Sequence, residues 1–158
     1  MMDITIREAT LVDLPKVAEL FDLYRQFYEQ KPDIEHAYQF ITDRFNNHES
    51  VILLADDKEA GLVGFCQLYP TFCSVEAAAI YSLYDLYVLP VARTHGVGKA
   101  LLLAAEAKAI AEGKVRMDLT TAKTNLPAQS LYESLGWLRD DIFYAYNKYP
   151  KNTHQDEK

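Results

Sequence analysis

The sequence lacks the long apolar runs and the cysteine content that mark membrane and disulfide-bonded proteins. A helix that crosses a bilayer needs about 18 consecutive apolar residues. The 158-residue chain contains no such run, so no membrane partner is expected. The two cysteines, Cys66 and Cys73, are too few for a disulfide framework. Because the first residues also show no basic and apolar leader, we expect a reduced, cytoplasmic protein.

The chain is also short of positive charge and of metal-ligand spacing. Lys and Arg number 16 against 23 Asp and Glu, which gives a formal net charge of -7. Proteins that bind nucleic acid present a broad basic face, so nucleic acid is not expected as a partner. The four histidines are scattered along the chain without the spacing of zinc ligands. We therefore predict no metal.

Hydrophobic periodicity predicts one α/β domain with a mixed sheet over residues 1–150 and a polar tail over 151–158. Helices are expected to begin near Thr10 and near Asp33, and to cover 98–112 and 127–135. Strands are expected over 4–6, 51–55, 62–69, 80–88 and 115–119, and finally at Trp137 and over 142–146. Pro70 is expected to end the third of these strands, with 71–77 as a loop.

The segment from Arg93 to Lys99, Arg-Thr-His-Gly-Val-Gly-Lys, lies between a predicted strand and a predicted helix. The first amides of a helix have no partner within it, and the helix dipole favours an anion there. Gly96 and Gly98 let the backbone approach that anion closely, and Arg93 adds positive charge. The segment therefore predicts a phosphate site. A tight turn with solvated basic residues is the alternative that the same residues allow.

Two common nucleotide motifs do not fit this segment. A Walker loop requires glycine in the place of Arg93 and serine or threonine in the place of Ala100. A dinucleotide fingerprint that begins at Gly96 requires a small residue in the place of Leu101. A phosphate-transferring nucleotide binder is thereby disfavoured.

Two motifs resemble those of the GNAT superfamily of N-acetyltransferases. The first, Arg/Gln-x-x-Gly-x-Gly/Ala, is matched by Arg93, Gly96 and Gly98, after the strand Leu86-Tyr87-Val88. The second, Asn-x-x-Ala-x-x-Leu-Tyr-x-x-x-Gly-Phe/Trp, is matched by Asn125, Ala128, Leu131, Tyr132, Gly136 and Trp137. The resemblance covers nearly the whole chain. It implies a single GNAT-like domain of α+β type, with a twisted, mostly antiparallel sheet flanked by about four helices.

The resemblance also implies how acetyl-CoA is bound. The pyrophosphate would be held beside Arg93 by the main-chain amides of Thr94, His95, Gly96, Val97, Gly98 and Lys99. The backbone of Leu86, Tyr87 and Val88 would pair with the pantetheine arm in the manner of an added strand. Asn125 would face the cofactor. Tyr132 would contact it and donate a proton to the leaving thiolate, with a packing role on a short helix as the alternative.

The candidate base is Asp85, the carboxylate on the strand before the phosphate loop. Family members with an acidic residue on this strand use it to draw the proton from the amine, and a structural hydrogen bond is the alternative for Asp85. Aromatic faces beside a carboxylate suit an ammonium group. We expect the acceptor site to include, with Asp85, the side chains of Tyr24, Phe27, Tyr28, Tyr69, Phe72 and Tyr84, although any one of them can instead belong to the core.

Together these features predict an N-acetyltransferase. It would move an acetyl group from acetyl-CoA to the primary amine of a small molecule, a polyamine or an amino-acid derivative, by direct attack in a ternary complex. Two alternatives stay open: a protein or peptide N-acetyltransferase, and a non-catalytic acyl-CoA-binding regulatory module. The resemblance further implies a homodimer.

Overall fold

The computed structural model describes residues 2–151, which fall into two compact units. The first unit reaches Thr120 and contains the sheet and the first three α-helices, and the second begins at Thr121 and contains α4, Leu126–Ser134. The predicted polar tail over 151–158 lies outside the described residues except for Lys151, which is exposed.

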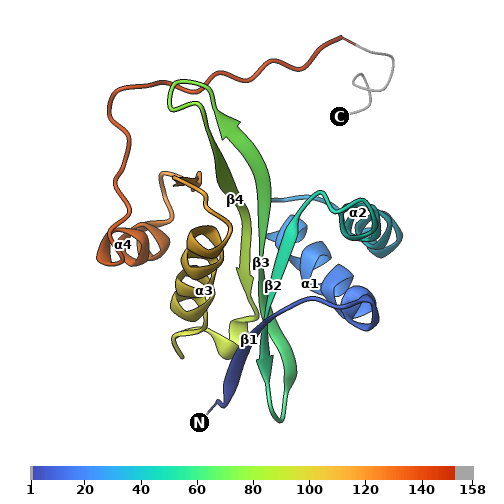
Figure 1. The fold of residues 1–158 in the computed structure, drawn as a ribbon. Helices are drawn as coiled ribbons and strands as arrows, with labels where there is room; N and C mark the ends of the chain where they lie inside the picture. The colour runs from blue at the N-terminus through green and yellow to red at the C-terminus, as the bar shows by residue number, and fades with distance from the viewer. Residues whose placement is uncertain (1, 152–158) are drawn as a thin grey trace. The chain divides into compact units, whose positions relative to one another are not determined.

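The sheet of the first unit is mixed and mostly antiparallel, as predicted (Figure 1). Its strands lie in the order β1-β2-β3-β4-β5, and only the β4–β5 pair is parallel. The strands are β1 Ile4–Glu8, β2 Val51–Asp57, β3 Gly61–Cys73, β4 Ala78–Val88 and β5 Met117–Asp118. Together with the helices, this arrangement confirms the α+β class.

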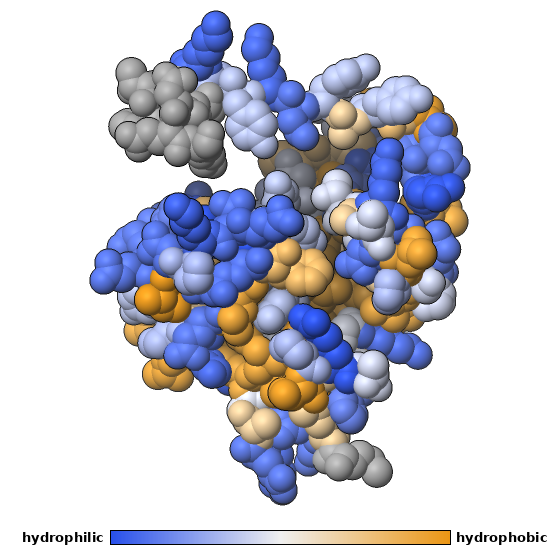
Figure 2. Space-filling model, turned by 180° about the vertical axis from the view of Figure 1, so that it is seen from behind, coloured by the Kyte–Doolittle hydropathy of each residue, from blue (hydrophilic) through white to orange (hydrophobic). Residues whose placement is uncertain are grey.

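Helices cover both faces of this sheet. In Figure 1, α1 (Leu14–Phe27) and α2 (Ile34–Asn46) lie on one side of the strands and α3 (Val97–Ala111) lies on the other. Apolar side chains of α1 are buried in the main core cluster, whose members include Leu14, Val17, Phe21, Ile41, Leu54, Phe65 and Tyr87. Hydrophilic side chains cover much of the surface seen in Figure 2, with hydrophobic side chains gathered in patches between them.

Two short 3-10 helices lead into the main helices of the first unit. The first, Leu11–Asp13, precedes α1 and begins at Thr10 with a capping box, in which the backbone amide of Thr10 donates to the Asp13 carboxylate at 2.7 Å. The second, Pro90–Ala92, follows β4. This turn connects β4 to the loop that precedes α3.

Strand β3 runs through Pro70 to Cys73, so the predicted stop at Pro70 is wrong. Of the predicted loop over 71–77, residues 74–77 form the turn between β3 and β4, and 71–73 belong to the strand. The pairing of β2 with β3 ends at Val51 and Leu68. Pro70 pairs with Tyr81 on β4, in a part of β3 that β2 no longer reaches. A proline is tolerated in such an edge position because its missing N–H would have had no ladder partner on that side.

The predicted late strands are wrong or shorter than expected. Strand β5 has two residues where 115–119 was expected. Trp137 and residues 142–146 lie in no strand, and the described chain after α4 has no regular element. Alternating apolar residues form a strand only beside a neighbour that takes up their backbone groups. The described part of the second unit contains a helix and offers no such neighbour.

Candidate functional site

The site begins with an irregularity in the pairing of β3 and β4. Gln67 pairs with Asp85 and Leu68 pairs with Leu83, which leaves Tyr84 as the extra residue of a β-bulge. Bulges redirect side chains and are common next to active sites. Tyr84 is 66% exposed while Asp85, the next residue, is 2% exposed. The bulge therefore brings a buried carboxylate next to an exposed ring.

The same strand loses its other neighbour just before the bulge. Strand β5 pairs with β4 only at Tyr81 and Ser82, so within the described first unit β4 continues to Val88 with β3 alone beside it. The backbone of the predicted pantetheine segment, 86–88, consequently faces an open sheet edge. An extended ligand can pair with such an edge as an added strand does.

The predicted phosphate loop follows β4 and leads into α3. Thr94 and Gly96 have positive φ values of 68° and 77°, and Gly96 is the N-cap residue of the 15-residue helix. Glycine has no side chain to occupy the first amides of the helix, and the residues from Arg93 to Gly96 are exposed. Those amides are therefore directed to the surface at the positive end of the dipole, as pyrophosphate binding requires.

Arg93 is tied to the end of β4. Its Nε donates to the carbonyl of Val88 at 2.9 Å, and its guanidinium lies 5.5 Å from the centre of the Tyr87 ring. From the sequence, Arg93 is expected only to add positive charge at the phosphate site. The structure adds that this side chain fixes the loop against the strand that is predicted to hold the pantetheine arm.

Asp85 is bound in a short chain of buried hydrogen bonds. Gln67 is fully buried, and its Nε2 donates to Oδ2 of Asp85. Ser50 donates from its hydroxyl to Oε1 of Gln67 at 2.7 Å. Burial raises the pKa of Asp85 to about 6, although the hydrogen bonds from Gln67 and Tyr24 act in the opposite direction. A carboxylate with a pKa near neutrality can accept a proton in a reaction.

Sequence reasoning missed Gln67 and Ser50. The available signal was a glutamine inside the otherwise apolar stretch from Leu62 to Leu68, since a polar residue in a buried strand needs a partner. The partner itself could not be named, because it depends on the shift in register at Tyr84.

The structure brings several of the predicted acceptor residues around Asp85. The hydroxyl of Tyr24 lies 3.1 Å from the carbonyl of Tyr84, and the rings of Tyr69 and Tyr84 lie 5.6 Å apart. Burial first, and the charge of Asp85 second, raise the pKa of both Tyr24 and Tyr69 above the ordinary range. Both phenols are therefore protonated and neutral at pH 7.

The remaining predicted aromatics are arranged differently. Tyr28 lies against Tyr24, with ring centres 5.1 Å apart, and Phe27 extends the same cluster. Phe72 pairs with Ala79, six residues along β4 from Asp85, and is 78% exposed. That separation corresponds to roughly 20 Å along a strand, so Phe72 lies well away from the Asp85 carboxylate.

The second motif forms the local structure of the second unit. Asn125 is the N-cap residue of α4, and its Oδ1 accepts from the amide of Ala128 at 3.3 Å. The ring of Tyr132 lies 6.1 Å from that of Trp137, whose amide donates to the carbonyl of Tyr132. Gly136 has a φ of 89° in the turn between them. The cofactor contacts expected of Asn125 and Tyr132 stay predictions.

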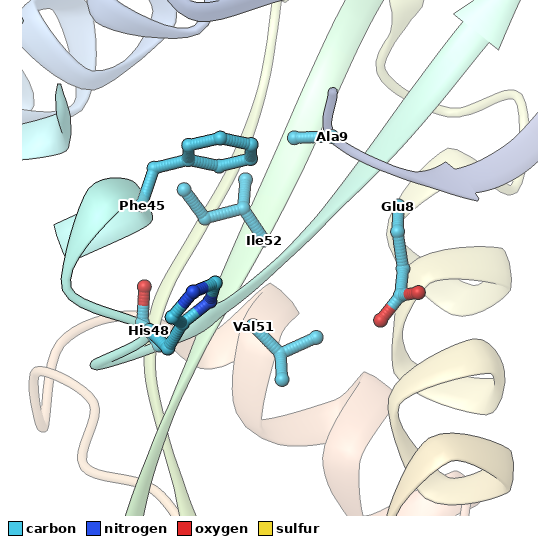
Figure 3. Close-up of a pocket in the computed structure, with 7 residues that line it drawn as sticks. Glu8, Ala9, Phe45, His48, Val51 and Ile52 are labelled. Atoms are coloured by element: carbon cyan, nitrogen blue, oxygen red, sulfur yellow. The ribbon is translucent and has the colours of Figure 1, made fainter. Parts of the chain in front are cut away.

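A surface cavity of about 180 Å³ lies at another place in the first unit (Figure 3). Its lining consists of Glu8, Ala9, Phe45, His48, Ser50, Val51 and Ile52. Glu8 is already engaged by Lys108 at 3.0 Å. Ser50 links this cavity to the Asp85 chain through its hydrogen bond to Gln67. Ionisable side chains with shifted pKa values lie together at Asp85, so we place the candidate site there.

The described residues offer neither a metal site nor a membrane-spanning helix. Among them no three His, Cys, Asp or Glu side chains are grouped so as to hold a metal ion. No helix in this part of the chain is long and apolar enough to cross a membrane.

Comparison with known proteins gives a consistent picture. The chain is 45% identical to the uncharacterized N-acetyltransferase YhfO of Bacillus subtilis (strain 168) over 141 residues, which cover 89% of this chain and 94% of that protein. A crystal structure of a probable acetyltransferase is 38% identical, with a TM-score of 0.87, and the match covers 94% of this chain and 99% of the other. The aminoglycoside N-acetyltransferase AAC(6')-Iy, solved in complex with CoA, shares the fold with a TM-score of 0.79 at 17% identity; the match covers 94% of this chain and 96% of the other.

Residues 17–137 match the Acetyltransferase (GNAT) family. With the open edge of β4 and the glycine-capped start of α3, this match places the chain: it belongs to the GNAT family of acetyltransferases.

Proposed function

We propose that this acetyltransferase moves the acetyl group of acetyl-CoA to the primary amine of a small cationic molecule, by direct attack in a ternary complex. One observation carries the proposal: Asp85 is a buried carboxylate with a pKa raised to about 6, and tyrosine rings surround it. A polyamine or an amino-acid derivative presents the ammonium group that such surroundings attract.

The residues around β4 and α3 fit acetyl-CoA. The amides from Thr94 to Lys99 are proposed to hold the pyrophosphate, and the free edge of Leu86, Tyr87 and Val88 the pantetheine arm. Acetyl-CoA supplies the activated acetyl thioester. The first unit supports this assignment with an exposed loop, a glycine N-cap and an edge strand that meet where β4 ends. Asn125 is proposed as a further contact on the strength of its motif.

Proton transfer is assigned to two side chains. Asp85 is proposed to take the proton of the incoming ammonium, directly or through water, because its pKa lies close to neutral pH. Tyr132 is proposed to return a proton to the departing thiolate. A phenol with an ordinary pKa near 10 stays protonated at neutral pH and can act as this acid.

The test is release of CoA thiol over a panel of amines with matched variants. Polyamines and amino-acid derivatives should react faster than neutral alcohols and thiols, and Tyr132→Phe should lower kcat by about 10²-fold or more. Trp137→Phe is the matched control, since it keeps an aromatic ring beside Tyr132. Binding of acetyl-CoA without turnover of any amine would instead indicate a regulatory acyl-CoA-binding module. Turnover of peptides alone would indicate a protein acetyltransferase.

We also propose a cytoplasmic homodimer. Six large apolar side chains that follow α4 are 77% to 93% exposed: Leu138, Ile142, Phe143, Tyr144, Tyr146 and Tyr149. A second copy of the chain would cover such side chains, which are costly to leave in water. Both cysteines are free thiols, as a reducing compartment allows. Sedimentation equilibrium tests the dimer, and a monomer at all protein concentrations would contradict it.

A further inference from the structure

We infer that Gln67 and Ser50 are positioning residues that fix the direction of the Asp85 carboxylate without neutralising it. This inference rests on the proposed role of Asp85 as the base. Gln67 and Asp85 are directly paired across β3 and β4 at the bulge, and both are buried. The side chain of Gln67 therefore has Asp85 at one end and Ser50 at the other.

Ser50 stabilises the orientation of the Gln67 amide in which the nitrogen faces Asp85. An amide carries an acceptor oxygen and a donor nitrogen on the same carbon, and the two can exchange places by rotation. The Ser50 hydroxyl donates to Oε1, so Nε2 is directed to the carboxylate. In this orientation the amide stabilises the ionised form of Asp85, and the opposite orientation would place an oxygen against it.

A neutral donor suits a base better than a cation does. A guanidinium or ammonium in the place of Gln67 would hold the pKa of Asp85 far below neutrality, and the carboxylate would then be a poor proton acceptor. An apolar side chain would remove the Gln67 donor from the carboxylate and raise the pKa of Asp85 further. Glutamine lies between these extremes: it orients the carboxylate while burial still keeps the pKa of Asp85 at about 6.

The titratable groups on which the charge of Asp85 acts are neutral at pH 7. Tyr24 reaches it from α1 and Tyr69 from β3, and burial raises the pKa of both phenols. Cys66 is the neighbour of Gln67 on β3, and burial raises the pKa of its thiol to about 12. Arg44 on α2 lowers the pKa of Tyr69. A proton taken up by this cluster near pH 6 therefore belongs to Asp85.

Loss of the Ser50 side chain should affect the Asp85 carboxylate less than loss of the Gln67 side chain. It lines the cavity in Figure 3, where a water molecule has room and polar groups to take the place of the missing hydroxyl. Gln67 is fully buried and has no such substitute. Substitutions at the two positions should therefore shift the pKa of Asp85 in the same direction, with the larger shift at Gln67.

The test compares the pH dependence of kcat/KM with the titration of Asp85, observed by NMR of ¹³C-labelled aspartate. In Gln67→Met the loss of the donor should move both midpoints upward by about one pH unit, with a roughly tenfold loss of kcat/KM below the midpoint. Ser50→Ala should move them in the same direction by less, and Ser50→Thr should restore the wild-type values. Cys73→Ala is the control, because Cys73 lies at the far end of β3, where it pairs with Ala78, and its loss should leave both midpoints in place.

The outcomes separate this inference from the proposed function. If the Asp85 midpoint is unchanged in Gln67→Met and Ser50→Ala, the positioning role is wrong even where Asp85 is the base. If the Asp85 midpoint moves and the kcat/KM profile does not, Asp85 is not the base, and the catalytic role of both positioning residues fails with it. Ser50→Ala decides the question where Gln67→Met does not fold.

Discussion

Two buried carboxylates of the first unit have opposite properties. Asp13 is 8% exposed and accepts from Arg7 at 2.7 and 2.9 Å and from the amide of Thr10, and these contacts hold its pKa well below the usual range. Asp85 is 2% exposed and has the neutral Gln67 as its donor, and burial raises its pKa to about 6. The charge of the partner, more than the depth of burial, distinguishes a fixed anion from a proton acceptor.

The two carboxylates also act on stability in opposite directions. The folded-state pKa of Asp13 is lowered, so its contribution is present above the ordinary value of 3.8 and is lost as the pH falls below it. The folded-state pKa of Asp85 is raised from 3.8 to about 6, so stability falls as the pH rises through that window and stays constant above it. A base kept in this state costs stability, as active sites commonly do.

The largest expected effect is on turnover. Asp85→Asn should lower kcat/KM by about 10²- to 10⁴-fold at pH 7, because a general base is removed and the shape is kept. The measurement is thiol release under subsaturating amine. Turnover should recover in part at high pH, where the amine arrives neutral, and wild-type activity at pH 7 would refute the role of Asp85.

The same substitution should stabilise the protein. A rise in pKa from 3.8 to about 6 corresponds to at most about 3 kcal/mol. Urea unfolding of Asp85→Asn and wild type should give curves that coincide near pH 4 and separate in favour of the variant as the pH rises to about 6. A variant less stable than wild type at pH 8 would mean that the ionised carboxylate is well accommodated.

Arg7→Met, in contrast, should destabilise the protein. Removing the cation leaves Asp13 ionised, with Thr10 as its remaining donor, and should destabilise the fold by about 1–3 kcal/mol at neutral pH. Chemical denaturation at pH 7 measures the loss. The thiol-release rate per folded molecule should stay within about twofold, since Arg7 lies on β1 and its partners are Asp13 and Asp56. A strong loss of turnover in folded protein would show that the first carboxylate also serves the reaction.

Gln67→Lys should make Asp85 resemble Asp13, because it gives the Asp85 carboxylate a cationic partner. An ammonium opposite Asp85 should move the acid limb of the kcat/KM profile downward by about 1–3 pH units, whereas Gln67→Met moves it upward. The quantity to compare is the direction of the two shifts. Shifts of the same sign would mean that distortion of β3, and not the charge of the partner, sets the behaviour of Asp85.

The sequence alone predicts the features that depend on local pattern. The apolar stripe from Leu14 to Phe21 predicts α1, and Arg93, Gly96 and Gly98 predict the loop before α3. Features that depend on a neighbouring strand could not be predicted from the sequence. Pro70 stays in β3 because β2 has already ended there, and the run over 142–146 forms no strand because none lies beside it in the described second unit.

The candidate site shows the same division. Asp85 could be chosen from its place before the phosphate loop, but its donor could not. The contact with Gln67 arises from pairing between strands whose register shifts at Tyr84, and a single extra residue changes which side chains are opposed. The Gln67 amide is in turn hydrogen-bonded to Ser50, 17 residues away in the chain.

The most direct test of the central claim is the titration of the aspartate carboxyls of the wild-type protein, followed by ¹³C NMR and assigned with Asp85→Asn. We expect Asp85 to titrate with a pKa of about 6, while Asp13 stays ionised well below the ordinary value of 3.8. An Asp85 signal that titrates at or below 3.8 would contradict it, because the neutral partner would then have produced the same fixed anion as the guanidinium.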